Sequence, residues 1–238
     1  MKTNSSSATQ PAQKNFWEAE IYSKGQHLCR YPFDNIVTFV YRNYPRHKPR
    51  SEIRILELGS GAGNNLWFAA REGFQVYGIE FSESAVAFAR DRFAQDGLQG
   101  HFIFGSFTHL PFEENFFDLI FDRGSLVCVS FPDACKTIRE AARVLLPGGR
   151  LFLNPYSRAH TSFSCGRLDE ATLLTRDIAG GTLVGVGSLC FYDEKMVDAL
   201  ITESGLQIIS KKHKVITEIA HGVEQHIHAE WEVTAQKP

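Results

Sequence analysis

Three glycines spaced two residues apart stand between two acidic side chains. Glu57 comes just before Gly59, Gly61 and Gly63, and Glu80 closes the next apolar run along the chain. Glycine lets a backbone turn sharply and approach a ligand closely, and a helix that starts after such a loop offers free N–H groups. A carboxylate at the tip of the second strand can accept hydrogen bonds from both hydroxyls of a ribose. The pattern therefore predicts a site for an adenosine-bearing cofactor.

The spacing of the glycines separates two classes of cofactor. A dinucleotide fingerprint is G-x-G-x-x-G, and the position of its third glycine is taken here by Asn64. The observed order is G-x-G-x-G, with Glu57 ahead of it. A nicotinamide-dependent oxidoreductase also needs a catalytic Tyr/Lys or histidine constellation, and the sequence contains no recognisable one. The dinucleotide interpretation is therefore the weaker alternative.

Short apolar runs alternate with helical patterns through the middle of the chain. This alternation predicts a parallel sheet with right-handed helical crossovers. Ligands bind at the carboxyl ends of the strands in such sheets, where Glu80 and Asp122 are expected to lie. The expected strands are 54–58, 75–80, 101–104, 117–122 and 150–154, and the expected helices are about 65–72, 82–93 and 133–144.

The segments outside this core differ in character. Residues 1–14 are polar and contain a serine run, which predicts a disordered tail. Residues 15–50 have aromatic and apolar positions at helical spacing, which predicts an N-terminal helical cap before the main domain, 51–238. Residues 155–190 are rich in Ser, Thr and Gly and are long enough for a substrate-covering insertion. The expected order ends with a helix capped by Asp193 and two strands, 206–217 and 226–234.

The glycine loop, with the acid before it and the acid after it, resembles motif I of the class I S-adenosylmethionine (SAM)-dependent methyltransferases of small-molecule type. That motif reads E/D-x-G-x-G-x-G. Leu110-Pro111-Phe112, Phe117-Asp118-Leu119-Ile120-Phe121 and Leu146-Pro147-Gly148-Gly149 look like later motifs of the family, and the resemblance covers about 53–234. It implies an α/β fold, a Rossmann-like three-layer sandwich. Its seven-stranded, mostly parallel sheet would have an antiparallel C-terminal strand, with the helical cap added at the N-terminus.

The resemblance also implies the cofactor, SAM, the product S-adenosylhomocysteine (SAH), and a set of contacts. Glu57 would serve the methionine end, Glu80 the ribose hydroxyls, and Phe81 one face of the adenine. The segment after the third strand would reach the adenine edge through Ser106 and the Phe107 backbone. The full set of implied cofactor-binding residues is Glu57, Gly59, Ser60, Gly61, Ala62, Gly63, Asn64, Asn65, Glu80, Phe81, Ser106, Phe107, Asp122, Arg123, Arg30 and Tyr31.

The acceptor half of the site is less defined, and no catalytic base can be assigned. Asp122 either faces the ligands or caps the turn that follows it. Arg123 could hold an acidic substrate through two parallel hydrogen bonds, or serve no ligand at all. The cap either contributes side chains to the site or only packs on it. The candidate catalytic residues are Tyr22, His27, Arg123, Tyr156 and His160.

Composition argues against several other classes of protein. A formal net charge of −2 and a pI near 6.5 give no general attraction to nucleic acid or to an anionic membrane. The five cysteines show no C-x-x-C spacing, which favours reduced thiols in the cytoplasm. His221, His226 and His228 lack a fourth ligand at familiar spacing, so we expect no metal. No stretch approaches the length of a membrane span.

The sequence therefore predicts an enzyme that transfers a methyl group from SAM to a small-molecule acceptor by in-line displacement. The nucleophile of that acceptor, O, N or S, stays open, and the protein is expected to be a monomer or a homodimer. A non-catalytic SAM-binding regulatory module is the main alternative, although loss of Glu57 or Glu80 would have favoured it and both are present. A nicotinamide-dependent oxidoreductase is the second alternative.

Overall fold

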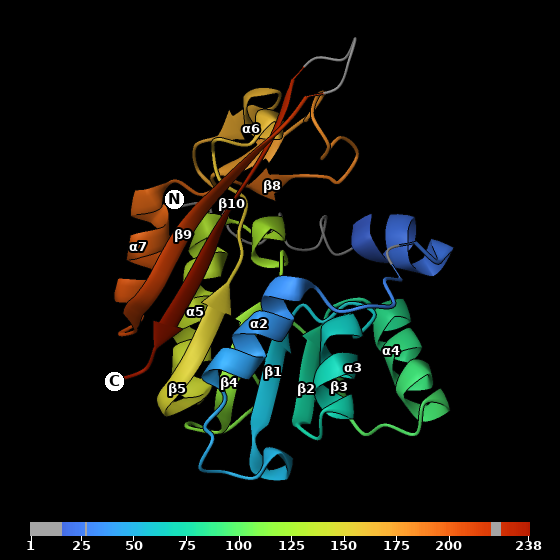
Figure 1. Ribbon diagram of the computed structural model, residues 1–238. Coiled ribbons are helices and arrows are strands. Elements are labelled where there is room, and N and C mark those ends of the chain that lie inside the picture. The colour runs from blue at the N-terminus through green and yellow to red at the C-terminus, as the bar shows by residue number, and fades with distance from the viewer. Residues whose placement is uncertain (1–15, 27, 220–224) are drawn as a thin grey trace, which may run out of the picture.

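A computed structural model describes residues 16–26, 28–219 and 225–238 (Figure 1). The expected tail, 1–14, lies outside the described residues, as do His27 and His221. Within the described part of the chain, no helix has the length and apolar character needed to cross a membrane.

A seven-stranded sheet forms the centre of the molecule, in the order β3-β2-β1-β4-β5-β10-β9. The strands from β1 to β5 are parallel to one another, whereas β10 is antiparallel to both β5 and β9. The predicted sheet and its antiparallel C-terminal strand are thereby confirmed. The strands are β1 (Arg54–Leu58), β2 (Gln75–Glu80), β3 (His101–Phe104), β4 (Phe117–Asp122), β5 (Leu145–Leu153), β9 (Gln207–Glu218) and β10 (His226–Gln236).

Helices cover both faces of the sheet and enclose a separate apolar core on each face (Figure 1). One core contains Phe39, Leu66 and Ala89 from the helices and Ile55 and Phe121 from the strands. The alternate strand residues point to the other core, as side chains of a strand do. The helices of the first face are α2 (Asp34–Asn43), α3 (Asn64–Arg71) and α4 (Glu83–Gln95), and those of the second are α5 (Phe131–Val144) and α7 (Glu194–Thr202).

Side-chain caps set the starts of several helices where the sequence predicts them. Ser82 accepts a hydrogen bond from the Ala85 N–H, and Asp193 accepts one from the Met196 N–H. Helix α5 begins two residues before the expected 133, because Ser130 is its cap and a proline follows in the first turn. Strand β5 begins at 145 instead of 150, because Leu145 already pairs with Phe117.

Two segments lie above the carboxyl ends of the strands (Figure 1). The N-terminal segment comprises the π-helix η1 (Trp17–Ile21) and the 3-10 helix η2 (Tyr22–Lys24). The segment after β5 contains α6 (Thr161–Ser164) and a three-stranded antiparallel sheet, β6 (Arg167–Asp169), β7 (Leu174–Arg176) and β8 (Leu189–Cys190). The sequence predicts an irregular cover here and misses the small sheet, whose strands are too short to give a period-2 signal.

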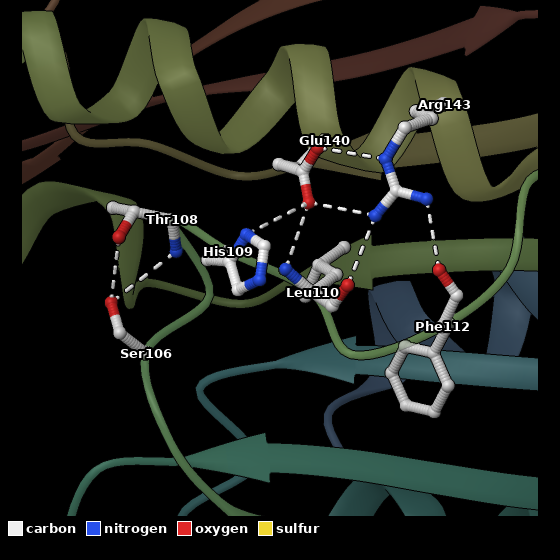
Figure 2. A network of polar contacts seen from close by, with 7 residues as sticks. All are labelled: Ser106, Thr108, His109, Leu110, Phe112, Glu140 and Arg143. Atoms are coloured by element: carbon white, nitrogen blue, oxygen red, sulfur yellow. Dashed lines mark hydrogen bonds and ion pairs between the residues drawn. The ribbon is translucent and has the colours of Figure 1, made fainter.

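Hydrogen bonds of Arg143 and Glu140 on α5, together called the clamp, fix the segment that follows β3 (Figure 2). Arg143 donates to the carbonyl oxygens of Leu110 and Phe112, at 2.9 and 2.8 Å, and its guanidinium also pairs with Glu140. Glu140 accepts from the Leu110 N–H at 2.9 Å. The Arg143 hydrogen bonds, only partly opposed by burial, lower the pKa of Glu140 to about 2. The clamp ties helix α5 to the loop that precedes β4.

Candidate active site

A cavity of about 510 Å³ lies at the carboxyl ends of the strands. The glycine loop forms part of its wall, and the N-terminal segment and the segment after β5 complete it. The cavity brings together most of the residues that the sequence singles out. These are Tyr22, Glu57, Gly59, Ser60, Gly61, Ala62, Asn64, Asn65, Glu80, Phe81, Arg123 and Tyr156.

Close packing around the loop explains its glycines. Gly59 and Gly61 have positive φ angles of 67° and 47°, a region that favours glycine. A Cβ on Gly59 would lie 2.3 Å from the Ser125 Cβ, and one on Gly61 would lie 2.6 Å from the Tyr22 hydroxyl. Gly63 does not line the cavity; its neighbours are Phe102 and Ala89, so it permits α3 to pack closely.

Glu80 is buried and shapes the loop as well as facing the cavity. One of its oxygens accepts from the Gly61 N–H at 2.9 Å. The other accepts from the N–H groups of Phe81 and Ser82, at 2.9 and 3.0 Å. Burial raises the pKa of Glu80, and these hydrogen bonds oppose the rise. Because each carboxylate oxygen has two lone pairs, the group can still accept from a ligand.

Glu57 presents an unsatisfied oxygen to the same cavity. Asn65 donates to its Oε1 at 2.7 Å, whereas its Oε2 is buried without a hydrogen-bond partner among the described residues. Burial raises the pKa of Glu57 well above its usual value. Asn65 also accepts from the Phe33 N–H at 3.0 Å, and Asn64 donates to the Tyr31 carbonyl at 2.9 Å. The start of α3 is thereby tied to the segment that precedes α2.

The N-terminal segment is anchored at the start of α4. Glu18 accepts hydrogen bonds from the hydroxyls of Ser82 and Ser84, at 2.6 and 2.5 Å, and from the Ser84 N–H at 3.3 Å. Although burial opposes it, these bonds lower the pKa of Glu18. A carboxylate at a helix N-terminus is also favoured by the helix dipole. This anchor holds Trp17 and Tyr22 in the cavity wall.

Tyr22 lines the cavity next to Gly61 of the glycine loop. Its ring centroid is 5.9 Å from that of Trp17. Burial raises the pKa of Tyr22, and the nearby Glu80, Cys128 and Glu57 raise it further. The hydroxyl therefore stays protonated and can donate a hydrogen bond, but it is a poor base at neutral pH.

The end of β4 contributes Arg123 to the cavity but not Asp122. Asp122 is fully buried, and its Oδ1 accepts from the N–H groups of Ser125 and Leu126, each at 3.0 Å, and from the Ser125 hydroxyl. It thus caps the turn into the 3-10 helix η4 (Leu126–Cys128), the second of the two roles that the sequence allows. The guanidinium of Arg123 lies over the Phe33 ring, 4.2 Å from its centroid.

Several expected cofactor contacts do not line the cavity. The Ser106 hydroxyl is 2.8 Å from that of Thr108, and Phe107 is buried in the core. Tyr31 is 69% exposed, and the Arg30 carbonyl accepts from Arg92. For these residues, and for Asp122 and Gly63, a role in cofactor binding stays a prediction that the cavity wall does not support.

His160 is buried behind the wall and not in it. Its Nδ1 accepts from the Ser162 N–H at 3.1 Å, and its Nε2 has no partner among the described residues. The ring centroids of His226 and His228 lie 5.1 and 5.3 Å from that of His160. Burial, helped by these two rings, lowers the pKa of His160 to about 4. In the part of the chain that is described, no group of His, Cys, Asp or Glu could hold a metal ion.

Sequence reasoning missed much of the apolar wall. The signals for these residues are weak, because Leu and Val in a Ser/Gly-rich stretch look like any loop and the aromatic positions look like core. Cys29 stands beside the predicted site residue Arg30, which is the only sequence signal for it. Gly124 and Ser125 line the cavity in the run that begins with the predicted residues Asp122 and Arg123. The missed lining residues are Trp17, Cys29, Phe33, Val127, Cys128, Thr182, Leu183, Val184, Val186 and Leu189.

Residues 55–149, which span β1 to the start of β5, match the family model of a methyltransferase domain. Over these residues the chain is similar to methyltransferases. The chain is 30% identical over 191 residues to the 27-O-demethylrifamycin SV methyltransferase of Amycolatopsis mediterranei (strain S699), over 79% of this chain and 63% of that relative. The chain spans 36% to 68% of the lengths of the curated relatives it matches.

Solved structures share the fold of this chain at low sequence identity. The 1,6-didemethyltoxoflavin-N1-methyltransferase of Burkholderia thailandensis, solved with 1,6-didemethyltoxoflavin and SAH, has a TM-score of 0.69 and 15% identity, over 100% of this chain and 92% of that one. The [4+2]-cyclase SpnF has a TM-score of 0.65 and 20% identity, over 98% and 96% of the two chains. At these identities the likeness shows the fold alone.

Proposed function

We propose that this protein transfers a methyl group from SAM to a small-molecule acceptor. One observation supports the proposal above all: the glycine loop, Glu57 and Glu80 line the same cavity. The two acids and the loop come from β1 and β2, so the sheet itself fixes their spacing.

The residues of the cavity fit the cofactor. The buried, unpartnered Oε2 of Glu57 suits the ammonium of the methionine part, because a buried acceptor without a donor costs free energy. The loop at Gly59 and Gly61 has no room for side chains, which leaves its backbone free to approach a ligand. We assign the ribose hydroxyls to Glu80 and one adenine face to Phe81, both of which line the cavity.

When bound, SAM supplies an activated methyl group on a positively charged sulfur and a neutral leaving group. The protein then has to align the nucleophile behind the methyl and exclude water, and alignment can supply much of the rate. We propose that the N-terminal cap, 15–50, and the insertion, 155–190, close the cavity for this purpose. Tyr22 from the first and Leu183 from the second already line it.

The cavity wall contains no histidine among the described residues, and burial raises the pKa of Tyr156. Tyr156 is therefore a poor general base at neutral pH, and we assign no base to the acceptor. The five cysteines are free, and we propose a cytoplasmic protein that acts as a monomer or a homodimer.

Two other functions fit the same fold. A non-catalytic SAM-binding module would keep the cofactor contacts and lack a closed acceptor pocket. The [4+2]-cyclase among the structural neighbours is named for a reaction other than methyl transfer. The apolar wall of Val127, Leu183 and Leu189 beside the cofactor half favours the transferase over the module.

The proposal is tested by calorimetric titration of the purified protein with SAM, SAH and NADH. We expect SAM and SAH to bind at about micromolar concentrations and NADH not to bind. Binding of NADH alone would overturn the proposal. Methyl-labelled SAM is then incubated with a panel of small phenols, amines, thiols and carboxylic acids. Label in an extractable product supports the transferase, whereas cofactor binding without transfer to any of them favours the module.

A further inference from the structure

Arg123 is the only cationic side chain that lines the cavity among the described residues. Its guanidinium lies 4.2 Å from the Phe33 ring centroid, and no hydrogen bond or ion pair engages it in the described structure. Its Nε is buried without a partner. A guanidinium has five N–H donors, and a partly buried cation without a partner is costly. The side chain is therefore placed to receive an acceptor group from a ligand.

The carboxylates near Arg123 make their hydrogen bonds and ion pairs with other groups, although the Oε2 of Glu57 and the Oδ2 of Asp122 are buried without a partner among the described residues. Glu230 is 3.3 Å from the His228 Nε2 and 4.0 Å from the Lys214 Nζ. The Oε1 of Glu57 is taken by Asn65, and burial raises the pKa of Glu57, which reduces its negative charge. Asp122 is used as a cap. These acids make the surroundings of Arg123 electrostatically favourable without occupying its donors.

Apolar side chains line the cavity together with Arg123. Val127, Leu183 and Leu189 are buried, and the rings of Phe33 and Tyr156 border the same cavity. A single cation in an apolar wall orients a ligand by one charged group while the rest of the ligand fills the pocket.

We propose that the acceptor of this enzyme is a largely apolar small molecule that carries a carboxylate, which Arg123 holds through two parallel hydrogen bonds. The geometry of a guanidinium matches a carboxylate better than any other common anion except phosphate. The inference rests on the proposed function and names its substrate class. The same chemistry could come from the methionine carboxylate of the cofactor, and the experiment separates these two sources.

The probes are 4-phenylbutanoate and its neutral isostere 4-phenylbutanamide, titrated by calorimetry into protein saturated with SAH. We expect the acid to bind at least about tenfold more tightly than the amide, because only the acid forms a charge-assisted pair. Arg123→Gln should abolish this preference and leave the affinity for SAH unchanged. Arg139→Gln is the matched control, because Arg139 is exposed on α5 and does not line the cavity.

Each other result counts against the inference. Equal binding of the two probes to the wild-type protein, or binding of neither, overturns it without any variant. A loss of SAH affinity of tenfold or more in Arg123→Gln, with the preference for the acid retained, assigns Arg123 to the cofactor carboxylate instead. If SAH does not bind the wild-type protein, the proposed function itself fails, a result distinct from loss of the acid preference with SAH bound.

Discussion

At the scale of single residues, Glu80 has two tasks. It faces the cavity, and it also accepts from the N–H groups of Gly61, Phe81 and Ser82. The sequence indicates the first task through the position of the acid at the end of a strand. The second task depends on where the loop folds back, which no spacing in the sequence reveals.

We expect Glu80→Ala to weaken SAH binding more than about tenfold, because charge-assisted hydrogen bonds are each worth about 1.5–3 kcal/mol. Calorimetry on the folded variant measures the change. Glu83→Ala is the control, because Glu83 is exposed in the first turn of α4. An unchanged affinity in Glu80→Ala would remove the ribose assignment.

Other residues show where sequence reasoning stops. Asp122 and Tyr31 stand in the right segments, yet one caps a turn and the other is exposed. Trp17 and Leu183 line the cavity, although they are far apart in the chain and neither carries a chemical signal. Residue type identifies groups that can do chemistry, but only the fold determines which of them face the same space.

At the scale of elements, the anchor between η1 and α4 controls one wall of the cavity. We expect Glu18→Gln to speed the release of SAH by about five- to tenfold, because the negative charge at the helix N-terminus is lost and a glutamine amide has one acceptor oxygen where the carboxylate has two. Stopped-flow tryptophan fluorescence reports the rate, since Trp17 lines the cavity.

The control for this variant is Glu20→Gln in the same helix. Glu20 is exposed and pairs only with Lys24 in the described structure. Equal release rates in wild type and Glu18→Gln would mean that the N-terminal segment does not limit the exit of the ligand.

The clamp on α5 gives a prediction about stability (Figure 2). Because the folded pKa of Glu140 is about 2, below the usual value of 4.5, its contribution is complete above about pH 4.5 and is lost as the pH falls through about 2. Glu140→Gln should lower the free energy of unfolding at pH 7 by up to about 3 kcal/mol, and the difference from wild type should shrink below pH 4.5.

Urea denaturation at several pH values measures this difference. Glu113→Gln, an exposed acid in the same loop, should change the stability by less than about 0.5 kcal/mol. A difference between wild type and Glu140→Gln that stays constant down to pH 3 would contradict the assigned pKa.

The sequence predicts the longer strands of the central sheet well, because their apolar pattern is visible in the sequence. The bounds of β1, β2 and β4 follow from largely buried apolar runs that end at charged or turn-forming residues, whereas β3 is exposed at both ends. The strands β6 to β8 have two or three residues each, and their pairing depends on the cavity cover as a whole. Local patterns cannot predict such pairs, because no individual strand has enough residues to show a period.

At the scale of the whole molecule, His160 links stability to pH. Its folded pKa is about 4, below its usual 6.5, so the unfolded chain binds more protons between these values and stability rises with pH across that window. His160→Asn keeps an acceptor for the Ser162 N–H but cannot titrate. Between pH 4 and 6.5 the free energy of unfolding should rise less in the variant than in the wild type, and the difference between the two rises should be at most about 3 kcal/mol.

Thermal or urea unfolding at intervals from pH 4.5 to 7.5 tests this, with His47→Asn at an exposed position as the control. The rings of His226 and His228, which lie next to residue 160, are unchanged in the wild type and in His160→Asn. Identical slopes for wild type and His160→Asn would show that another group controls the acid response.

The position of β10 has a consequence for the folding of this protein. β10 lies between β5 and β9 although it follows both of them in the chain. Until β10 is in place, β5 has no partner on that side and β9 is not joined to the sheet. Each then has an open edge, which can pair with a strand of another unfinished chain. The folding protein therefore stays vulnerable to aggregation until β10 has paired, and chaperones that bind exposed strands would act in this interval.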